Sequence, residues 1–292
     1  MRLFRKTKKL ILIILGILVC FNIIAWIAVY NLSRPQALEV VFFDIGQGDS
    51  IFIEVPNGNQ ILIDGGPDST VLEKLADEMP FYDRSIDLII LTHPEHDHFR
   101  GLFEILKRYD VDYILWTGIV RDTNEWKEWV RLIEEEGADI KIAEKGQRII
   151  LSENPFIFID ILHPFENLAG QKFKRANETS IVSHLFFDNV SFLFTGDITK
   201  KIELKLIEPG EDLNSEVLKV AHHGSKTSSG QEFLKAVGPE LAVIQVGENN
   251  YGHPHPEVLA RLEEFGIEVL RTDKDGNIKI VSDGDNLIID VD

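Results

Sequence analysis

The chain has 292 residues, of which 44% are hydrophobic and 27% are charged. This composition is typical of a folded globular protein and excludes a disordered or low-complexity chain. The formal net charge of −18 disfavours broad, nonspecific binding to polyanions, which requires clustered basic residues. The one cysteine, Cys20, lies in an apolar N-terminal segment, so the remainder has no disulfide, no thiolate nucleophile and no cysteine metal ligand.

Residues 10–30 contain no charged side chain, and a helix of this length can cross the hydrocarbon core of a bilayer. Five basic residues precede this segment, whereas only Arg34 follows closely, which predicts a cytoplasmic N-terminus. We therefore expect a cytoplasmic basic tip (1–9), a single-pass transmembrane helix (10–30), a linker (31–37) and an extracytoplasmic domain (38–292). A cleavable signal peptide is the alternative, but no small-residue cleavage site follows. Subtracting the five basic charges from −18 leaves −23 on the rest of the chain.

The first half of the domain predicts a meander of strands followed by helices. Alternating apolar residues indicate strands at 38–44, 50–55 and 60–64, with a hairpin turn at 56–59. Helical periodicity follows at 71–78, 101–108 and 124–136, and an almost wholly apolar strand is expected at 85–91.

The second half of the domain shows the same pattern of strands and helices. Strands are expected at 156–162, 181–187, 190–195 and 217–220, and helices at 200–208, 231–237 and 256–265. Two successive runs of strands and helices predict an α/β fold in which two sheets pack face to face with helices outside. No repeat or low-complexity tract indicates a second globular domain.

The apolar strand at 85–91 leads into a segment crowded with potential metal ligands. Imidazoles and carboxylates stand within six positions, at His93, Glu95, His96, Asp97 and His98. Such a set of nitrogen and oxygen ligands suits zinc, manganese or iron. The alternative is a histidine-rich surface loop without a ligand.

Further ligand-type residues also follow predicted strands. Asp64 ends the strand at 60–64, Asp197 follows the strand at 190–195, and His222 and His223 follow the strand at 217–220. Loops at one edge of a layered fold carry functional groups, so these side chains can converge there. Taken alone, Asp197 could instead cap the next helix.

Together these motifs resemble those of the metallo-β-lactamase superfamily, and more specifically the hydrolase domain of the ComEC/Rec2 competence proteins. The resemblance covers roughly residues 38–280 in order. The motifs are Phe43-Asp44-Ile45-Gly46-Gln47-Gly48-Asp49-Ser50, Ile63-Asp64-Gly65-Gly66, Thr92-His93-Pro94-x-x-Asp97-His98, Phe194-Thr195-Gly196-Asp197, Leu218-Lys219-Val220-x-His222-His223-Gly224-Ser225, and Asn249-x-Tyr251-Gly252-His253-Pro254.

The resemblance implies a four-layer αββα sandwich with two divalent metal ions, zinc or manganese, at one edge of the sheets. By motif position, His93 and Glu95 would hold one ion, Asp97, His98 and His223 the other, and Asp197 would bridge them. Asp64 would not contact the metal but would hydrogen-bond to the histidine ligands and fix their tautomers. Whether His222 or His223 is the ligand stays open, with His223 preferred.

The sequence departs from the family pattern at two positions. Glu95 stands where many members have histidine, and the region upstream of Asp197, where many have a further histidine ligand, reads Asn177-Glu178-Thr179-Ser180. More oxygen ligands weaken the preference for zinc and admit manganese. Occupancy by a single ion is the alternative to a dinuclear centre.

In this interpretation the metal ions activate water for attack on phosphorus, and Asp97 is both a ligand and a catalytic residue. His222, Ser225, Lys226 and His253 would stabilise the phosphoryl oxygens or assist the leaving group. Asn177 and Tyr251 are expected beside the substrate, with Tyr251 stacking on a base. The competing interpretations are a solvated surface lysine at Lys226 and a tyrosine that only packs its loop.

The expected activity is a phosphodiesterase or nuclease related to DNA uptake, acting on single-stranded DNA or another phosphodiester. A separate DNA-uptake channel protein is an expected partner, because the chain shows one apolar span rather than a multi-helix channel. Two alternatives stay open: a metallohydrolase of a small or cell-wall phosphoester, or a metal-poor binding domain without catalysis. The one basic cluster near the expected site is Lys172, Lys174 and Arg175.

Overall fold

The computed structural model describes residues 2–32, 37–208 and 212–291, in two compact units divided at Ala37. The first unit contains α1 (Arg2–Leu32), along which large apolar side chains such as Leu12 and Phe21 are exposed. Among the described residues, no helix is both long and apolar enough to cross a membrane. The expected transmembrane span over residues 10–30 thus finds no support in the structure, and residues 33–36 of the predicted linker lie outside the described residues.

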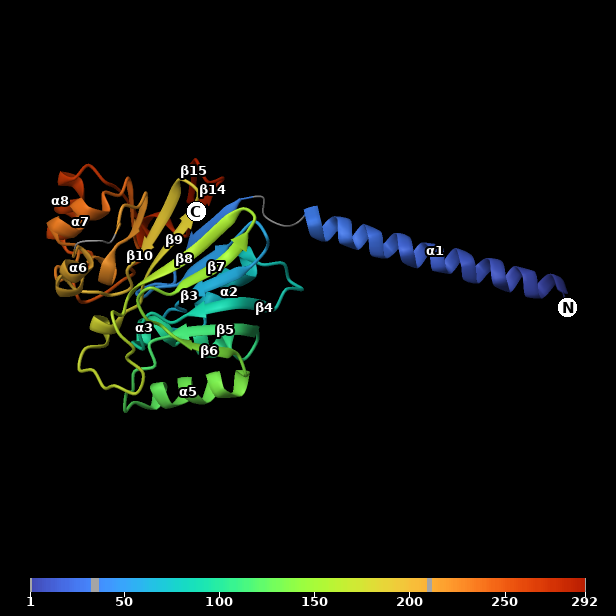
Figure 1. Ribbon diagram of the computed structural model, residues 1–292, viewed down its shortest axis with the longest axis horizontal. Helices are drawn as coiled ribbons and strands as arrows, with labels where there is room; N and C mark the ends of the chain where they lie inside the picture. Colours follow the sequence, from blue (N-terminus) through green and yellow to red (C-terminus); the bar gives the residue numbers. More distant parts are fainter. Residues whose placement is uncertain (1, 33–36, 209–211, 292) are drawn as a thin grey trace. The chain divides into compact units, whose positions relative to one another are not determined.

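The second unit contains an eight-stranded sheet in the order β15-β14-β1-β2-β3-β4-β5-β6 (Figure 1). Strands β1 to β3 pair antiparallel, and strands β3 to β6 pair parallel. Near the C-terminus the chain returns to this sheet, where β14 pairs antiparallel with β1 and the last strand, β15, pairs with β14. The strands are β1 (Leu38–Phe42), β2 (Ile51–Glu54), β3 (Gln60–Ile63), β4 (Ser85–Ile90), β5 (Asp110–Trp116), β6 (Asp139–Ile142), β14 (Ile278–Ser282) and β15 (Leu287–Val291).

The other sheet has seven strands in the order β13-β12-β11-β10-β9-β8-β7. Strands β7 to β10 pair antiparallel, and strands β10 to β13 pair parallel. The strands are β7 (Arg148–Glu153), β8 (Phe156–His163), β9 (Val182–Phe187), β10 (Val190–Phe194), β11 (Val217–Lys219), β12 (Leu241–Ile244) and β13 (Glu268–Arg271).

The two sheets bury one apolar layer between them. Phe42 and Ile53 from the first sheet and Ile161 and Phe192 from the second belong to the same buried cluster. Side chains alternate along a strand, so Val41 and Phe52 point the other way and belong to a separate cluster on the outer face of the first sheet. The expected sandwich of two sheets is therefore confirmed.

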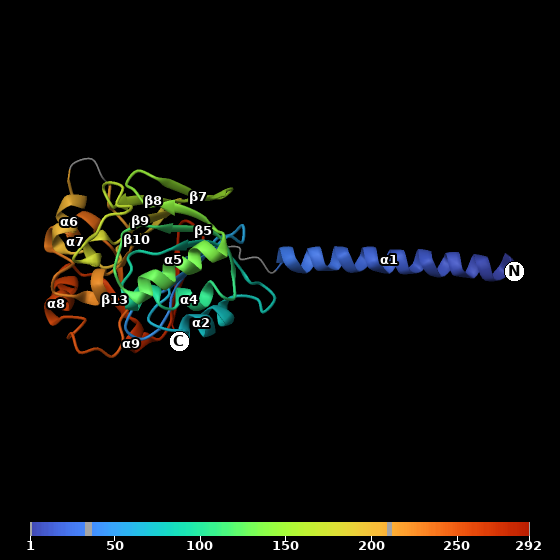
Figure 2. The ribbon, with the colours of Figure 1, turned by 90° about the horizontal axis from the view of Figure 1, so that it is seen from below.

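Helices cover both outer faces (Figure 2). The outer cluster of the first sheet includes buried residues of α2 (Thr70–Glu78), α3 (His96–Phe99), α4 (Leu102–Ile105) and α5 (Asn124–Glu136), and that of the second includes residues of α6 (Lys200–Leu206), α7 (Gln231–Val237) and α8 (Pro256–Glu264). Helix α5 begins where the side chain of Thr123 accepts from the Trp126 amide, and it ends at Gly137 in the left-handed conformation. The short segments η1 (Ala176–Thr179), η2 (Ala221–Gly224) and α9 (Thr272–Asp275) lie in loops.

The helix predicted at 124–136 matches α5, but the helix predicted at 101–108 is wrong in length, because only α4 is regular. Seven strands were not predicted, namely β5, β6, β7, β12, β13, β14 and β15. The side chains of β6 and β15 are mostly exposed, so these two strands lack the apolar alternation that indicates a half-buried strand, whereas β12 is wholly buried and was missed although it is apolar.

Trp129 on α5 is fully buried and contacts the rings of Phe99, Phe103 and Trp116. We expect Trp129→Ala to lower the free energy of unfolding by about 3–5 kcal/mol, because it leaves a large cavity under the helix. The control is Phe81→Ala, which alters a ring that is 87% exposed and should change stability by less than about 0.5 kcal/mol. Urea unfolding of both variants measures the difference, and equal losses would contradict this packing.

Candidate metal centre

Acidic and histidine side chains converge at the edge of the sandwich where parallel strands of both sheets end. Strands β3 and β4 are parallel, as are β10 and β11, so the loops after them emerge at the same edge of their sheets. Ligand atoms within 4.8 Å of one another form four overlapping groups: His93, His98 and Asp197; Asp97, His98 and His223; Asp49, Asp197 and His223; and Asp49, Asp64 and His98. Seven side chains from five loops thus form one cluster, which we call the ligand cluster.

Each imidazole of the ligand cluster is oriented through its Nδ1 atom. His98 Nδ1 lies 2.8 Å from Asp64 Oδ2, and His223 Nδ1 lies 2.9 Å from the carbonyl oxygen of Gln245. Thr92 Oγ1 donates to Asp64 Oδ2 at 2.6 Å and lies 3.0 Å from His93 Nδ1, so it is free to accept from that ring. With Nδ1 engaged, Nε2 of all three rings is the atom available to a metal ion.

Among the described residues, the inward-facing atoms of the ligand cluster have no hydrogen-bond partner. These buried atoms are His93 Nε2, His98 Nε2, His223 Nε2, Asp49 Oδ1 and Asp197 Oδ1. Leaving a buried polar atom unpaired costs free energy, so several such atoms aimed at one another point to a missing cation. Imidazole nitrogen with carboxylate oxygen suits Zn²⁺ or Mn²⁺, and the residues present therefore fit a divalent metal ion.

The pKa values also show a centre that attracts positive charge. Burial opposes protonation of His223, but the carboxylates of Asp197 and Asp49 raise its pKa to about 10. His98 is likewise buried, and Asp197, Asp49 and Asp64 hold its pKa well above the usual range. Burial and the neighbouring His98 lower the pKa of His93 to about 3. A metal ion would displace the protons on His98 and His223, so its affinity should rise with pH.

The backbone at η2 separates the two adjacent histidines. His222 and His223 adopt left-handed φ values of 54° and 51°, which are strained for residues other than glycine. Gly224 follows with φ +77°, and a Cβ there would lie 2.7 Å from the Cβ of Pro254. This turn buries His223 within the ligand cluster and leaves His222 partly exposed beside it.

A row of polar and aromatic side chains leads outward from Asp197. His222 Nε2 lies 3.7 Å from Asp197 Oδ2, and Asn177 Nδ2 lies 3.4 Å from the same oxygen and 3.3 Å from His222 Nε2. The ring of His253 lies 5.5 Å from that of His222, and Tyr251, 75% exposed, lies 5.7 Å from His253. These predicted substrate residues are thus brought together on the open side of the ligand cluster.

Three other predicted site residues are not members of the ligand cluster. The carboxylate of Glu95 pairs with Arg121 at 2.5 Å and belongs to none of the four groups, so its predicted ligation has no geometric support. Lys226 is exposed, and its main-chain carbonyl accepts from Lys200 Nζ at 2.9 Å. Ser225 is buried, and its hydroxyl lies 3.0 Å from that of Thr227.

Two site residues were not predicted, namely Asp49 and Lys219. Lys219 is 1% exposed; its ammonium pairs with Asp49 and lies 4.0 Å from Asp197 Oδ1. Asp49 in turn lies 3.3 Å from His223 Nδ1. The available signal was a lysine inside the apolar strand Val217–Lys219, because a charged residue in a buried strand requires a partner.

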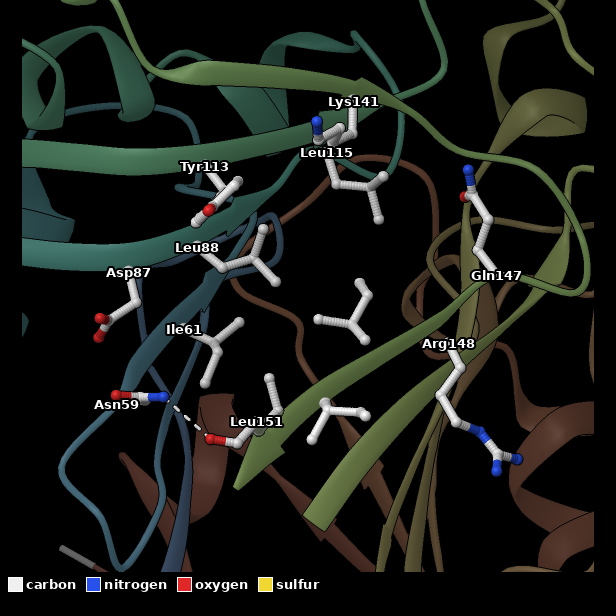
Figure 3. Close-up of a pocket in the computed structure, with 12 residues that line it drawn as sticks. Asn59, Ile61, Asp87, Leu88, Tyr113, Leu115, Lys141, Gln147, Arg148 and Leu151 are labelled. Carbon is white, nitrogen blue, oxygen red and sulfur yellow. Dashed lines mark hydrogen bonds between the residues drawn. The ribbon is translucent and has the colours of Figure 1, made fainter. Parts of the chain in front are cut away.

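Two cavities differ in their relation to the ligand cluster. A cavity of about 430 Å³ adjoins it and is lined by residues that include His222, Asn177, Arg175, Glu178, Lys200 and Lys201. A cavity of about 480 Å³ lies between the sheets, where Ile61, Leu88 and Leu115 of the first sheet face Leu151 of β7 (Figure 3). None of the residues that line this larger cavity belongs to the ligand cluster, so we place the functional site at the smaller one.

The fold and the ligand cluster together define a metal-dependent hydrolase. The model of the metallo-beta-lactamase superfamily matches residues 43–248, and the chain belongs to this superfamily. It is 31% identical to ComE operon protein 3 of Bacillus subtilis over 280 residues, which cover 89% of this chain and 35% of that protein. It is 30% identical to the competence protein ComA of Neisseria gonorrhoeae, over 84% of this chain and 33% of that protein. The chain spans about a third of the length of these curated relatives, which are of the ComEC/Rec2 type.

Solved structures show the same fold at lower identity. The metallo hydrolase Igni18 of Ignicoccus hospitalis has a TM-score of 0.54 at 19% identity, over 82% of this chain and 98% of that one. The long form RNase Z from yeast has a TM-score of 0.51 at 12% identity, over 84% of this chain and 42% of that one. At these identities the likeness concerns the fold.

The buried pair of Lys219 and Asp49 generates a stability prediction. Lys219→Met should lower the free energy of unfolding of the metal-free protein by about 3–5 kcal/mol, because it leaves the Asp49 carboxylate buried without its partner. The double variant Lys219→Met with Asp49→Asn should recover much of that loss. Chemical denaturation of the single and double variants measures the coupling, and strictly additive losses would contradict the pairing.

Glu203 of α6 stabilises the loop between η2 and α7 by hydrogen bonds. Its carboxylate accepts from the amides of Ser229 and Gly230 at 2.5 and 2.8 Å. Burial raises its pKa to about 7, although both amides and the nearby Lys200 and Arg261 favour the charged form. Since the folded pKa exceeds the ordinary value of 4.5, the native state binds more protons between about pH 4.5 and 7. The contribution of Glu203 to stability therefore declines as pH rises through that window.

We expect Glu203→Gln to flatten this pH dependence. The free energy of unfolding of the variant minus that of the parent should rise by an amount on the order of 3 kcal/mol from pH 5 to pH 8. The reason is that glutamine does not ionise, so only the parent loses stability over this range. Urea unfolding at the two pH values provides the measurement. A difference between variant and parent that stays constant with pH would show that Glu203 does not titrate in this window.

Proposed function

We propose that this protein is a metal-dependent phosphodiesterase that acts on single-stranded nucleic acid. The observation that carries the proposal is the placement of unpaired buried ligand atoms directly beside the open row of Asn177, His222, His253 and Tyr251. A centre that binds metal and is flanked by neutral hydrogen-bonding groups suits a phosphoryl group, whose oxygens accept hydrogen bonds.

Within this proposal the ligand cluster would hold the metal. His93, His98, Asp97, Asp197 and His223 would supply the ligand atoms, for one ion or for two, zinc or manganese. A divalent ion bound there would supply an activated water and neutralise charge on the phosphoryl oxygen. Asp97 is 31% exposed at its side chain and lies 3.4 Å from His223 Nε2, so it borders both the buried ligands and the substrate side.

The exposed row positions the substrate. Asn177 Nδ2 donates to non-bridging phosphoryl oxygens, and His222 lies beside it on the same face. Burial and the neighbouring His222 and His223 lower the pKa of His253 to about 4, so the ring is neutral at pH 7 and can donate one hydrogen bond and accept another. Tyr251 is exposed, and its ring is available to stack on a base.

The relatives named as competence proteins support nucleic acid as the substrate. Membrane attachment through residues 10–30, an extracytoplasmic site and a role in DNA uptake with a separate channel protein belong to the same proposal. They rest on the sequence of the N-terminal segment and on these names. A small or cell-wall phosphoester is the second candidate, and the net charge of −18 favours it, because that charge repels long polyanions.

The proposal predicts metal-dependent hydrolysis of phosphodiesters. With Mn²⁺ or Zn²⁺, the full chain should cleave both bis(p-nitrophenyl) phosphate and a short single-stranded oligodeoxynucleotide, and EDTA should abolish both activities. Asp197→Ala and Asp97→Ala should lower kcat by about a thousandfold or more, because each removes a metal ligand.

The matched control is Asp139→Ala, which removes an exposed carboxylate at the start of β6 and should leave both activities unchanged. Hydrolysis of the small diester alone would favour the second candidate. A parent protein that binds metal but cleaves neither substrate would contradict the proposal.

A further inference from the structure

The cavity that adjoins the ligand cluster is lined by three basic side chains, Arg175, Lys200 and Lys201. We call it the flanking pocket. Basic residues are outnumbered in this chain, with 30 lysines and arginines against 48 acidic residues, so three basic residues and one acidic residue, Glu178, around one cavity are a local reversal of charge. The flanking pocket therefore offers an anion a favourable position on an otherwise repulsive protein.

The flanking pocket and the ligand cluster are adjacent through two side chains. His222 and Asn177 line the pocket, and both also lie next to Asp197, with Asn177 Nδ2 3.4 Å from Asp197 Oδ2. A ligand whose phosphoryl group sits at the cluster can thus continue past these two side chains into the pocket. The continuation that suits three cations is another phosphate.

Resting on the proposed function, we propose that the flanking pocket binds the phosphate adjacent to the scissile one, so that the enzyme prefers a phosphodiester chain over an isolated phosphodiester. Arg175 and Lys201 are the recognition residues, with exposed side-chain fractions of 79% and 64%. The ammonium of Lys200 already donates to the Lys226 carbonyl and contributes charge to the rim.

In the structure Glu178 pairs with both recognition residues. Its carboxylate lies 2.9 Å from Lys201 Nζ and 3.5 Å from Arg175 Nη1. Exposed ion pairs of this kind contribute only about 0–1 kcal/mol, so a phosphate can take over both cations at little cost. Glu178 then acts as an internal competitor that weakens binding of the chain.

The test compares two substrates in variants of the metal-loaded full chain. Arg175→Ala with Lys201→Ala should raise KM for a short single-stranded oligodeoxynucleotide by about tenfold or more, and leave KM for bis(p-nitrophenyl) phosphate unchanged. The slope of the logarithm of oligonucleotide affinity against the logarithm of salt concentration should become shallower by about 0.7 for each phosphate that the variant no longer neutralises. Glu178→Gln should shift KM for the oligonucleotide the opposite way, downward, because it frees both cations.

The chain offers a matched control in Glu104, which pairs with Lys107 at 2.8 Å and with Arg108 at 2.6 Å. This second trio precedes β5, at the opposite end of the sheet from the ligand cluster. Lys107→Ala with Arg108→Ala removes the same two positive charges as Arg175→Ala with Lys201→Ala. Glu104→Gln removes one negative charge, as Glu178→Gln does. Neither should change KM for either substrate by more than about twofold if the effect is local.

An oligonucleotide KM that stays unchanged in the pocket variants, or that moves equally in the control variants, would overturn the inference while the proposed function stands. If the parent cleaves no phosphodiester, the proposed function fails instead. Fluorescence anisotropy with a labelled oligonucleotide in EDTA then still tests the pocket. Binding abolished only in the Arg175 and Lys201 variant supports it, and equal binding in all variants overturns it.

Discussion

The arrangement of this protein's site depends on the charge balance of one buried cluster. Four carboxylates, from Asp49, Asp64, Asp97 and Asp197, meet three imidazoles at the edge of the sandwich. The ammonium of Lys219 neutralises the carboxylate of Asp49, while the carboxylate of Asp64 accepts from Thr92 and contacts the ring of His98. Buried atoms that face one another therefore remain unpaired among the described residues, and a cation is the group that satisfies them.

The fold creates this cluster by bringing strand ends together. The parallel pairs β3–β4 and β10–β11 end at the same edge, and the loop after β1 joins them. Gly48 in that loop approaches so closely that a Cβ would lie 2.2 Å from the Asp97 carbonyl oxygen, and the Asp49 amide donates to that oxygen. Residues far apart in sequence thus become neighbours because the backbone permits close approach.

Much of this could be predicted from the sequence, because ligand residues directly followed apolar strands. His93, His98, Asp64, Asp197 and His223 were all placed at strand ends, and the structure brings them together. Glu95 and Lys226 were assigned from motif position, but the direction of a side chain depends on its partners: Glu95 pairs with Arg121, and Lys226 stays exposed. Asp49 was missed because its importance comes from Lys219, which lies 170 residues away in sequence.

The central claim is that the ligand cluster binds a divalent ion in exchange for protons. Calorimetric titration of the EDTA-treated full chain with Mn²⁺ or Zn²⁺, in buffers of different ionisation enthalpy, measures both the metal stoichiometry and the protons released. The account predicts one or two ions per chain, net proton release near neutral pH because His98 and His223 are protonated without metal, and loss of binding in His223→Ala. Absence of binding, or equal binding by the parent and His223→Ala, would contradict it.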